Sequence, residues 1–122
     1  MDENIRKLKE KGTPDRWRYA VALEKMGKPA VEYLTHALTD EDKWVRYVAA
    51  DALGNIGDQC CVDSLIVALK DIDQDVRFAA AEALGKLGDV RALNALNETC
   101  KGDNCYVKIA AEDAITTISK QK

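Results

Sequence analysis

Glycine, proline and aromatic residues are scarce in this sequence of 122 residues, which holds seven Gly, two Pro and 6% aromatics. Antiparallel sandwiches and barrels need frequent turns and strands rich in aromatic and β-branched residues. Charged residues reach 32%, and the mixture is rich in Ala, Leu, Lys, Glu and Asp, which favours helices. The composition therefore argues against the all-β classes and predicts one globular all-α unit.

Long apolar runs are also missing. No stretch approaches the roughly 18 apolar residues that a membrane-spanning helix needs. The opening Met1, Asp2, Glu3 and Asn4 lack the basic and apolar segments of a signal peptide. We therefore expect a cytoplasmic protein that has no membrane partner.

The net charge is only −3, and it is unevenly distributed. Residues 1–28 hold eight basic and five acidic side chains, a local +3, so the remaining residues carry −6. A mild acidic excess argues against nucleic acid as a partner, because phosphate binding needs a concentrated basic face. The basic end is interpreted as a solvated terminal cap, with docking of an acidic partner as the alternative.

Histidine and cysteine do not form a recognisable metal motif. The four cysteines are Cys60, Cys61, Cys100 and Cys105, and His36 is the only histidine. Structural zinc sites use Cys pairs at short spacings, twice or together with two His, and neither pattern occurs. We expect reduced thiols that pack as small apolar residues, and no cofactor. A disulfide between Cys100 and Cys105, or a shared soft-metal site, remains the alternative.

The chain repeats itself with a period of 31 residues. The segment 46–57, RYVAADALGNIG, aligns with the segment 77–88, RFAAAEALGKLG. A second segment of each unit also recurs, and apolar positions in both halves follow the spacing of three and four that is typical of amphipathic helices. Each unit is therefore predicted to be a pair of helices, whose apolar faces become buried only by stacking on neighbouring pairs.

The predicted fold is an α-solenoid of stacked antiparallel helix pairs with terminal capping helices. Glycines at 27, 57 and 88 are expected to end the first helix of each pair, and Asp side chains between units to cap the next helix. The predicted helices span residues 3–11, 15–26, 29–38, 43–56, 59–69, 74–87, 90–100 and 105–119. One domain, 1–122, then comprises a cap at 1–12, repeats at about 13–40, 41–71 and 72–102, and a C-terminal half-repeat at 103–122.

Val45-Arg46 and Val76-Arg77, the Ala-rich segments, Ala-Leu-Gly and the Gly-Asp turn resemble the short HEAT-like repeats of the phycobilisome-lyase type. The resemblance implies a ladder between neighbouring units, formed by an Asp in the turn and an Arg six residues later. Asp40 with Arg46 and Asp71 with Arg77 match that pattern. Gly102 stands six residues before Lys108, so the ladder is not expected at the C-terminal cap.

A non-catalytic protein–protein interaction scaffold or adaptor is the predicted function. The second helices are expected to line the concave face and to present a modest apolar patch that suits a helix or loop of a partner protein. The predicted partner-binding residues are Tyr33, His36, Ile66, Val67, Asn94 and Asn97. In the alternative interpretation, Ile66 and Val67 simply pack on the adjoining helix. The partner's identity and the oligomeric state do not follow from these residues.

Two other classes of function compete with this one. The resemblance to phycobilin lyases implies an accessory subunit of a lyase-type or other enzyme complex. Catalysis by this chain is not expected, because Cys60 and Cys61 have no base nearby and His36 lies on a different helix pair. Trp17 and Trp44 could stack on nucleic-acid bases, but both stand at the starts of helices and are expected to be packing or rim residues.

Overall fold

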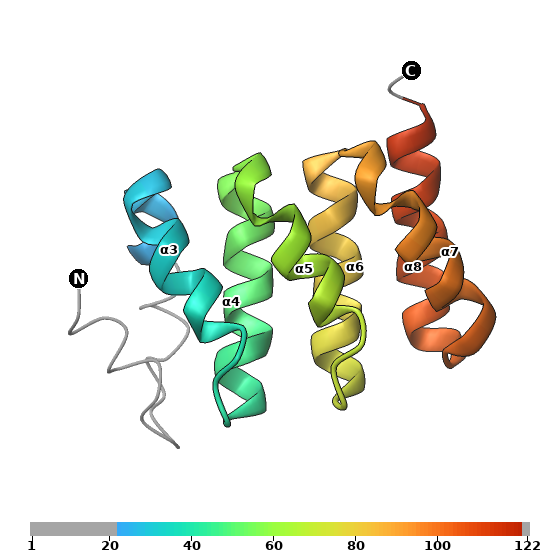
Figure 1. The fold of residues 1–122 in the computed structure, drawn as a ribbon, viewed down its shortest axis with the longest axis horizontal. Helices are drawn as coiled ribbons and strands as arrows, with labels where there is room; N and C mark the ends of the chain where they lie inside the picture. The colour runs from blue at the N-terminus through green and yellow to red at the C-terminus, as the bar shows by residue number, and fades with distance from the viewer. Residues whose placement is uncertain (1–21, 121–122) are drawn as a thin grey trace.

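The first helix of each repeat forms one layer and the second helix forms another. The structure is a computed structural model that describes residues 22–120. In Figure 1, α4, α6 and α8 lie side by side, and the shorter α3, α5 and α7 lie in front of them. The helices are α3 (Lys28–Ala37), α4 (Lys43–Ile56), α5 (Val62–Ala68), α6 (Gln74–Leu87), α7 (Leu93–Gly102) and α8 (Cys105–Ser119). This arrangement is an α-solenoid, as the repeat predicted.

The helix boundaries agree closely with those expected from the sequence. Three predicted helices, 43–56, 74–87 and 105–119, have the same bounds as α4, α6 and α8. The predicted helices at 59–69 and 90–100 each begin with a short 3-10 turn, η1 (Gln59–Cys61) and η2 (Val90–Ala92), before α5 and α7. Residues 22–26 are helical, whereas the predicted helix at 3–11 and the start of the one at 15–26 lie outside the described residues.

Local side-chain chemistry sets both ends of the long helices. Asp42, Asp73 and Asn104 are the N-caps of α4, α6 and α8, and each side chain accepts a hydrogen bond from a backbone N–H of the first turn. Gly57 and Gly88 end α4 and α6 in the left-handed conformation, with φ of 79° and 67°. These caps recur because the turn sequences recur, which accounts for the accuracy of the predicted boundaries.

The core consists of the same positions in successive repeats. Val45, Val76 and Val107 are completely buried on the first helices, and the same is true of three leucines on the second helices, Leu34, Leu65 and Leu96. Each set is spaced by 31 residues. One continuous core therefore runs through the stack, rather than one core for each helix pair.

Glycine sets the distance between the first helices. A Cβ on Gly54 would lie 2.7 Å from Cα of Ala83, and one on Gly85 would lie 3.1 Å from Cα of Ala114. Backbone therefore packs on backbone where α4 meets α6 and where α6 meets α8. In α8 the equivalent position is Thr116, which is exposed at the end of the stack.

Within residues 22–120, no helix has both the length and the apolar character that crossing a membrane requires.

Candidate protein-binding surface

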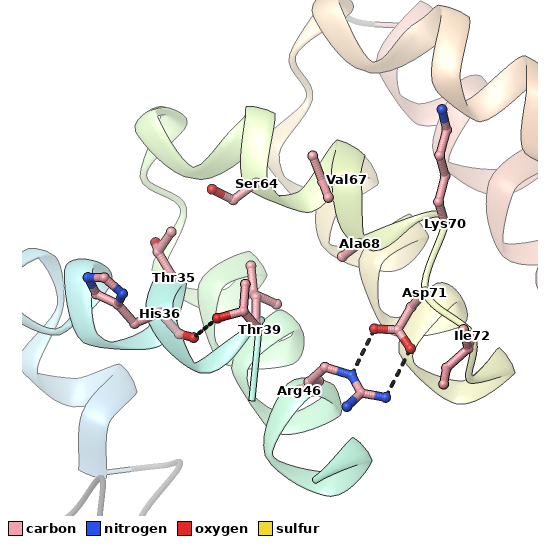
Figure 2. Close-up of a pocket in the computed structure, with 11 residues that line it drawn as sticks. Thr35, His36, Thr39, Arg46, Ser64, Val67, Ala68, Lys70, Asp71 and Ile72 are labelled. Atoms are coloured by element: carbon pink, nitrogen blue, oxygen red, sulfur yellow. Dashed lines mark hydrogen bonds and ion pairs between the residues drawn. The ribbon is translucent and has the colours of Figure 1, made fainter. Parts of the chain in front are cut away.

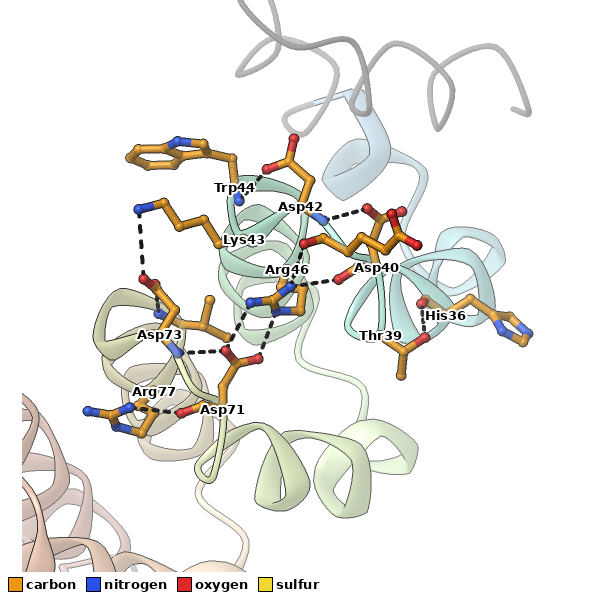
Figure 3. Close-up of polar contacts among 12 residues, drawn as sticks. His36, Thr39, Asp40, Asp42, Lys43, Trp44, Arg46, Asp71, Asp73 and Arg77 are labelled. Carbon is orange, nitrogen blue, oxygen red and sulfur yellow. Dashed lines mark hydrogen bonds and ion pairs between the residues drawn. The ribbon is translucent and has the colours of Figure 1, made fainter.

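An arginine and an aspartate connect each repeat to the next. Arg46 of α4 donates from Nε to Oδ2 of Asp71 at 2.8 Å and from Nη2 to Oδ1 at 3.1 Å, which is a bidentate pair. Its Nη1 donates to the backbone carbonyl oxygens of Asp40 and Glu41. The side chains of Arg46 and Asp71 are only 12% and 11% exposed. The guanidinium thus holds the turn before its own helix and the turn of the following unit (Figure 3).

The same set of contacts recurs one repeat later. Arg77 of α6 donates from Nε and Nη2 to the two carboxylate oxygens of Asp103, at 2.7 and 3.1 Å. Its Nη1 donates to the backbone carbonyl oxygen of Asp71 at 2.8 Å. Asp71 is therefore shared, because its carboxylate binds Arg46 and its carbonyl binds Arg77 (Figure 3). The chain of contacts links three successive turns.

These contacts differ in detail from the ladder expected from the resemblance. An Asp and the Arg six residues later do interact, but through the aspartate's backbone carbonyl, and the carboxylate partner comes from the next unit. The ladder also reaches the C-terminal cap, through Asp103. Sequence reasoning missed Asp103 because it stands five residues before Lys108 rather than six. An Asp in every turn between units, at 40, 71 and 103, was the signal that could have found it.

A groove separates α3 from α5. Its volume is about 670 Å³, and its lining includes His36 and Thr39 near the end of α3, Val67 of α5, and the Arg46–Asp71 pair (Figure 2). Ile72, in the turn after α5, completes one side and is 94% exposed. The groove is open to solvent and mixes apolar side chains with a charge pair whose members already satisfy each other.

A second groove, of about 490 Å³, separates α5 from α7. Ile66 lines it from α5, Asn94 and Glu98 line it from α7, and the Arg77–Asp103 pair contributes as Arg46–Asp71 does in the first groove. The two grooves flank α5 and repeat the same design. Each is lined by the second helices of two adjacent repeats and contains an arginine–aspartate pair, whose arginine lies on the first helix of the later repeat.

Comparison with known proteins identifies the fold family. The sequence matches HEAT repeats over residues 7–60 and again over residues 31–116. The chain belongs to the HEAT repeat family. No curated protein sequence matches it.

Solved structures of HEAT-like proteins superpose on almost the whole chain. The complex of CpcE and CpcF of phycocyanin lyase from Nostoc is similar, with a TM-score of 0.81 and 28% identity. The match covers 98% of this chain and 53% of that one. Human deoxyhypusine hydroxylase in complex with glycerol gives a TM-score of 0.82 and 25% identity, covering 98% of this chain and 43% of that one. This HEAT repeat chain thus spans about half the length of the solved proteins that it matches.

An engineered protein shares the fold alone, at a TM-score of 0.64 and 21% identity, covering 97% of this chain and 62% of that one.

In this HEAT repeat protein, the predicted partner-binding residues are spread over the surface formed by the second helices α3, α5 and α7. His36 and Val67 line the groove between α3 and α5, whereas Ile66 and Asn94 line the groove between α5 and α7. Tyr33 and Asn97 are exposed but line neither groove. Val67 is 71% exposed, whereas Ile66 packs partly against the core. The two side chains of α5 therefore have different environments, and adjacent positions on this short helix face different grooves.

All four cysteines are free thiols in the structure. Cys61 is buried, and its Sγ donates to the backbone carbonyl oxygen of Asp58. Burial, followed by the nearby Cys60 and Asp58, raises the pKa of Cys61 to about 11. Burial also raises the pKa of Cys100. Among the described residues, no group of three or more His, Cys, Asp or Glu side chains is arranged to hold a metal ion.

Trp44, expected to be a packing or rim residue, is 48% exposed at the start of α4. Trp17 lies outside the described residues.

Proposed function

We propose that this HEAT repeat protein is a non-catalytic adaptor that holds a partner protein along its second helices. The observation that carries the proposal is the pair of matching grooves on either side of α5. A helix or loop of a partner laid across α5 would contact both grooves at once. The similarity to a structure of the CpcE–CpcF complex supports protein association as the mode of action.

The exposed apolar side chains of the first groove would provide the binding free energy. Val67 is 71% exposed and Ile72 is 94% exposed, and both line this groove. Covering them would remove apolar surface from water at about 25 cal/mol per Å². The Arg46–Asp71 pair below them holds α4 and the following turn in place, so the groove exists before the partner arrives.

Two hydroxyl groups and one ion pair of the first groove are already engaged in hydrogen bonds. The hydroxyl of Thr35 donates to the carbonyl oxygen of Val31 at 2.7 Å, and that of Thr39 donates to the carbonyl oxygen of His36 at 2.8 Å. Arg46 and Asp71 bind each other. A nucleophile needs an adjacent base within hydrogen-bonding distance, and these hydroxyls are directed to the backbone instead. We therefore assign the grooves a role in recognition. We also propose that the protein acts in the cytoplasm.

An accessory subunit of a lyase-type enzyme complex is the second candidate. It is favoured by one observation, the 28% identity to the complex of CpcE and CpcF of phycocyanin lyase. In that case the same grooves would hold the enzyme subunit or its protein substrate. The two candidates differ in what copurifies, because an enzyme complex retains a measurable activity whereas a simple adaptor holds a partner without one.

The decisive experiment compares two valine substitutions. Val67→Asp places a carboxylate in the first groove, whereas Val90→Asp places one on η2, at a valine that is 54% exposed and lines neither groove. A partner captured from native cytosol and then purified should bind the parent chain and Val90→Asp alike, but Val67→Asp at least about tenfold more weakly. Equal binding by both folded variants, checked by circular dichroism, would exclude the groove as the partner site.

A further inference from the structure

The solvent-facing side of the first helices carries a regular grid of side chains. Positions along α4 recur in α6 and α8 at intervals of 31 residues. One row across the three helices is Tyr47, Phe78 and Ile109, and the next row is Asp51, Glu82 and Asp113. Within the part of the chain that the structure describes, this apolar row and acidic row are adjacent on each helix. They lie on the layer opposite the second-helix grooves.

A shallow groove between α6 and α8 confirms that the rows share one face. It has a volume of about 260 Å³ and is lined by Phe78 and Glu82 from α6 and by Ile109 and Asp113 from α8. Burial of Tyr47 raises its pKa, and the charges of Asp51, Glu82 and Asp75 raise it further. Carboxylates of both α4 and α6 therefore act on Tyr47, which occupies the same position on α4 as Phe78 on α6.

The apolar row is flanked by aromatic rings that are partly open to solvent. Phe78 stacks on Tyr106, with ring centroids 4.4 Å apart and planes inclined by 3°. Trp44 meets Tyr47 edge to face at 6.0 Å. Trp44, Tyr106 and Ile109 are 48%, 43% and 59% exposed. Aromatic faces of this kind attract cations, and the guanidinium group of arginine most often.

Lys86 lines the groove beside the acidic row, but within the described residues it forms no ion pair with it. Among residues 22–120, no ion pair engages Asp51, Glu82 or Asp113. Lys86 lies on the same face, but its Nζ donates to Oδ1 of Asn55 at 2.6 Å. The three carboxylates give this surface a negative charge that complements a basic partner. Such a partner would also cover the adjacent row of apolar and aromatic side chains.

We propose that this aromatic and acidic face of the first helices binds an arginine-rich segment of a partner protein. Guanidinium groups would stack on the rings of Tyr47 and Phe78, or cover Ile109, while they donate to carboxylates of the acidic row. Arginine makes this combination better than lysine. Adjacent packed helices lie about 8–10 Å apart. A polyproline II chain advances about 9 Å in three residues and presents every third side chain on the same side, so arginine at every third position matches the spacing between neighbouring helices.

The test is direct binding of a defined peptide. The probe is a labelled synthetic peptide that carries arginine at every third position with glycine and serine between, and a glutamate version serves as the negative probe. We expect only the arginine peptide, and not the glutamate version, to bind. Its affinity should fall as the salt concentration is raised to about 0.15 M. Replacing arginine by lysine should weaken binding, since lysine loses the planar stacking.

Two charge-reversal variants test whether the peptide binds to this face or is attracted only by the net charge of the protein. Glu82→Lys removes a carboxylate from the middle of the acidic row, whereas Glu32→Lys reverses an exposed carboxylate on α3, in the other layer. Glu82→Lys should weaken binding about fivefold to tenfold, and Glu32→Lys should leave it nearly unchanged. Tyr106→Leu, which keeps an apolar side chain but removes the ring, should also weaken it.

Three results would overturn this proposal. They are no binding at low salt, equal weakening by the two charge reversals, and full affinity in both Glu82→Lys and Tyr106→Leu. Val67→Asp, the variant that tests the second-helix grooves, should not weaken the arginine peptide. Failure of one surface can therefore be told apart from failure of the other.

Discussion

Arg46 of one repeat binds both carboxylate oxygens of Asp71 in the turn that leads to the next repeat. The same carboxylate accepts a hydrogen bond from the backbone N–H of Asp73 at 2.9 Å, which shapes the turn before α6. One aspartate thus fixes a local turn and a contact with an arginine that lies 25 residues away in the sequence. A partly buried ion pair stabilises a fold more when additional hydrogen bonds satisfy its remaining polar atoms, and both Arg46 and Asp71 form such bonds.

Removing one arginine of the ladder should destabilise the protein. In Arg77→Ala, Asp103 keeps its charge in a site where its side chain is only 12% exposed, without its partner. We expect the free energy of unfolding to fall by about 2–3 kcal/mol, measured by urea denaturation. Arg91→Ala is the control, because the side chain of Arg91 is 53% exposed in its pair with Asp89 and its loss should matter far less. Equal stability of Arg77→Ala and the parent chain would contradict a structural role for the ladder.

The close approach of α4 and α6 predicts an unusual effect of adding a methyl group. Alanine normally stabilises a helix relative to glycine, by up to about 1 kcal/mol. In Gly54→Ala, however, the new Cβ would meet Cα of Ala83 at 2.7 Å, so the helices must separate. We expect a net loss of about 1–3 kcal/mol in the free energy of unfolding.

Gly102→Ala is the matched control for this close approach. Gly102 lies in α7 and does not adopt a positive φ, and a methyl group on its Cα would meet no packed neighbour within 4 Å. Thermal melting should therefore show Gly102→Ala as stable as the parent chain or slightly more stable. A destabilised Gly102→Ala with an unaffected Gly54→Ala would contradict the packing described here.

The buried thiol of Cys61 predicts a loss of stability at alkaline pH. Its pKa is raised to about 11 in the folded protein, whereas an unfolded thiol titrates near 8.5. The neutral form is therefore favoured by folding, so this contribution is fully present below about pH 8.5 and is lost as the pH rises to about 11. One pKa unit corresponds to about 1.4 kcal/mol, so we expect a loss of up to about 3 kcal/mol across this range.

Cys61→Ala isolates that contribution from other groups that titrate in the same range. Tyr47 and Tyr106 also have raised pKa values, and both are retained in the variant. The free energy of unfolding, measured under reducing conditions at a series of pH values, should fall less steeply in Cys61→Ala than in the parent chain. Identical pH profiles would show that this thiol does not control alkaline stability.

The N-cap of α6 should be worth more than the ion pair beside it. Asp73 accepts a hydrogen bond from the backbone N–H of Val76 at 3.1 Å, and it lies 3.9 Å from Nζ of the exposed Lys43. Asp73→Ala should cost about 1 kcal/mol through loss of the cap. Lys43→Ala keeps the cap and should change the melting temperature much less. If the two variants melt alike, the ion pair rather than the cap stabilises this turn.

The sequence by itself determined the helices and their order. Helix bounds at 43–56, 74–87 and 105–119 followed from the 31-residue repeat, the glycines at 57 and 88, and the capping residues in each turn. These signals are local, because apolar periodicity, caps and turns act within a few residues of one another. Stacking followed as well, since a single helix pair has too little apolar surface to fold alone.

Only the tertiary structure decided which side chains meet across repeats. The carboxylate that binds Arg46 comes from Asp71 and not from Asp40, and Asp103 takes the equivalent place for Arg77 although its spacing differs by one residue. Ile66 and Val67 are adjacent in sequence, yet they line different grooves. The physical reason is that these contacts depend on how far apart packed helices lie and how they are inclined. Small residues such as Gly54 and Ala83 set that geometry from different repeats.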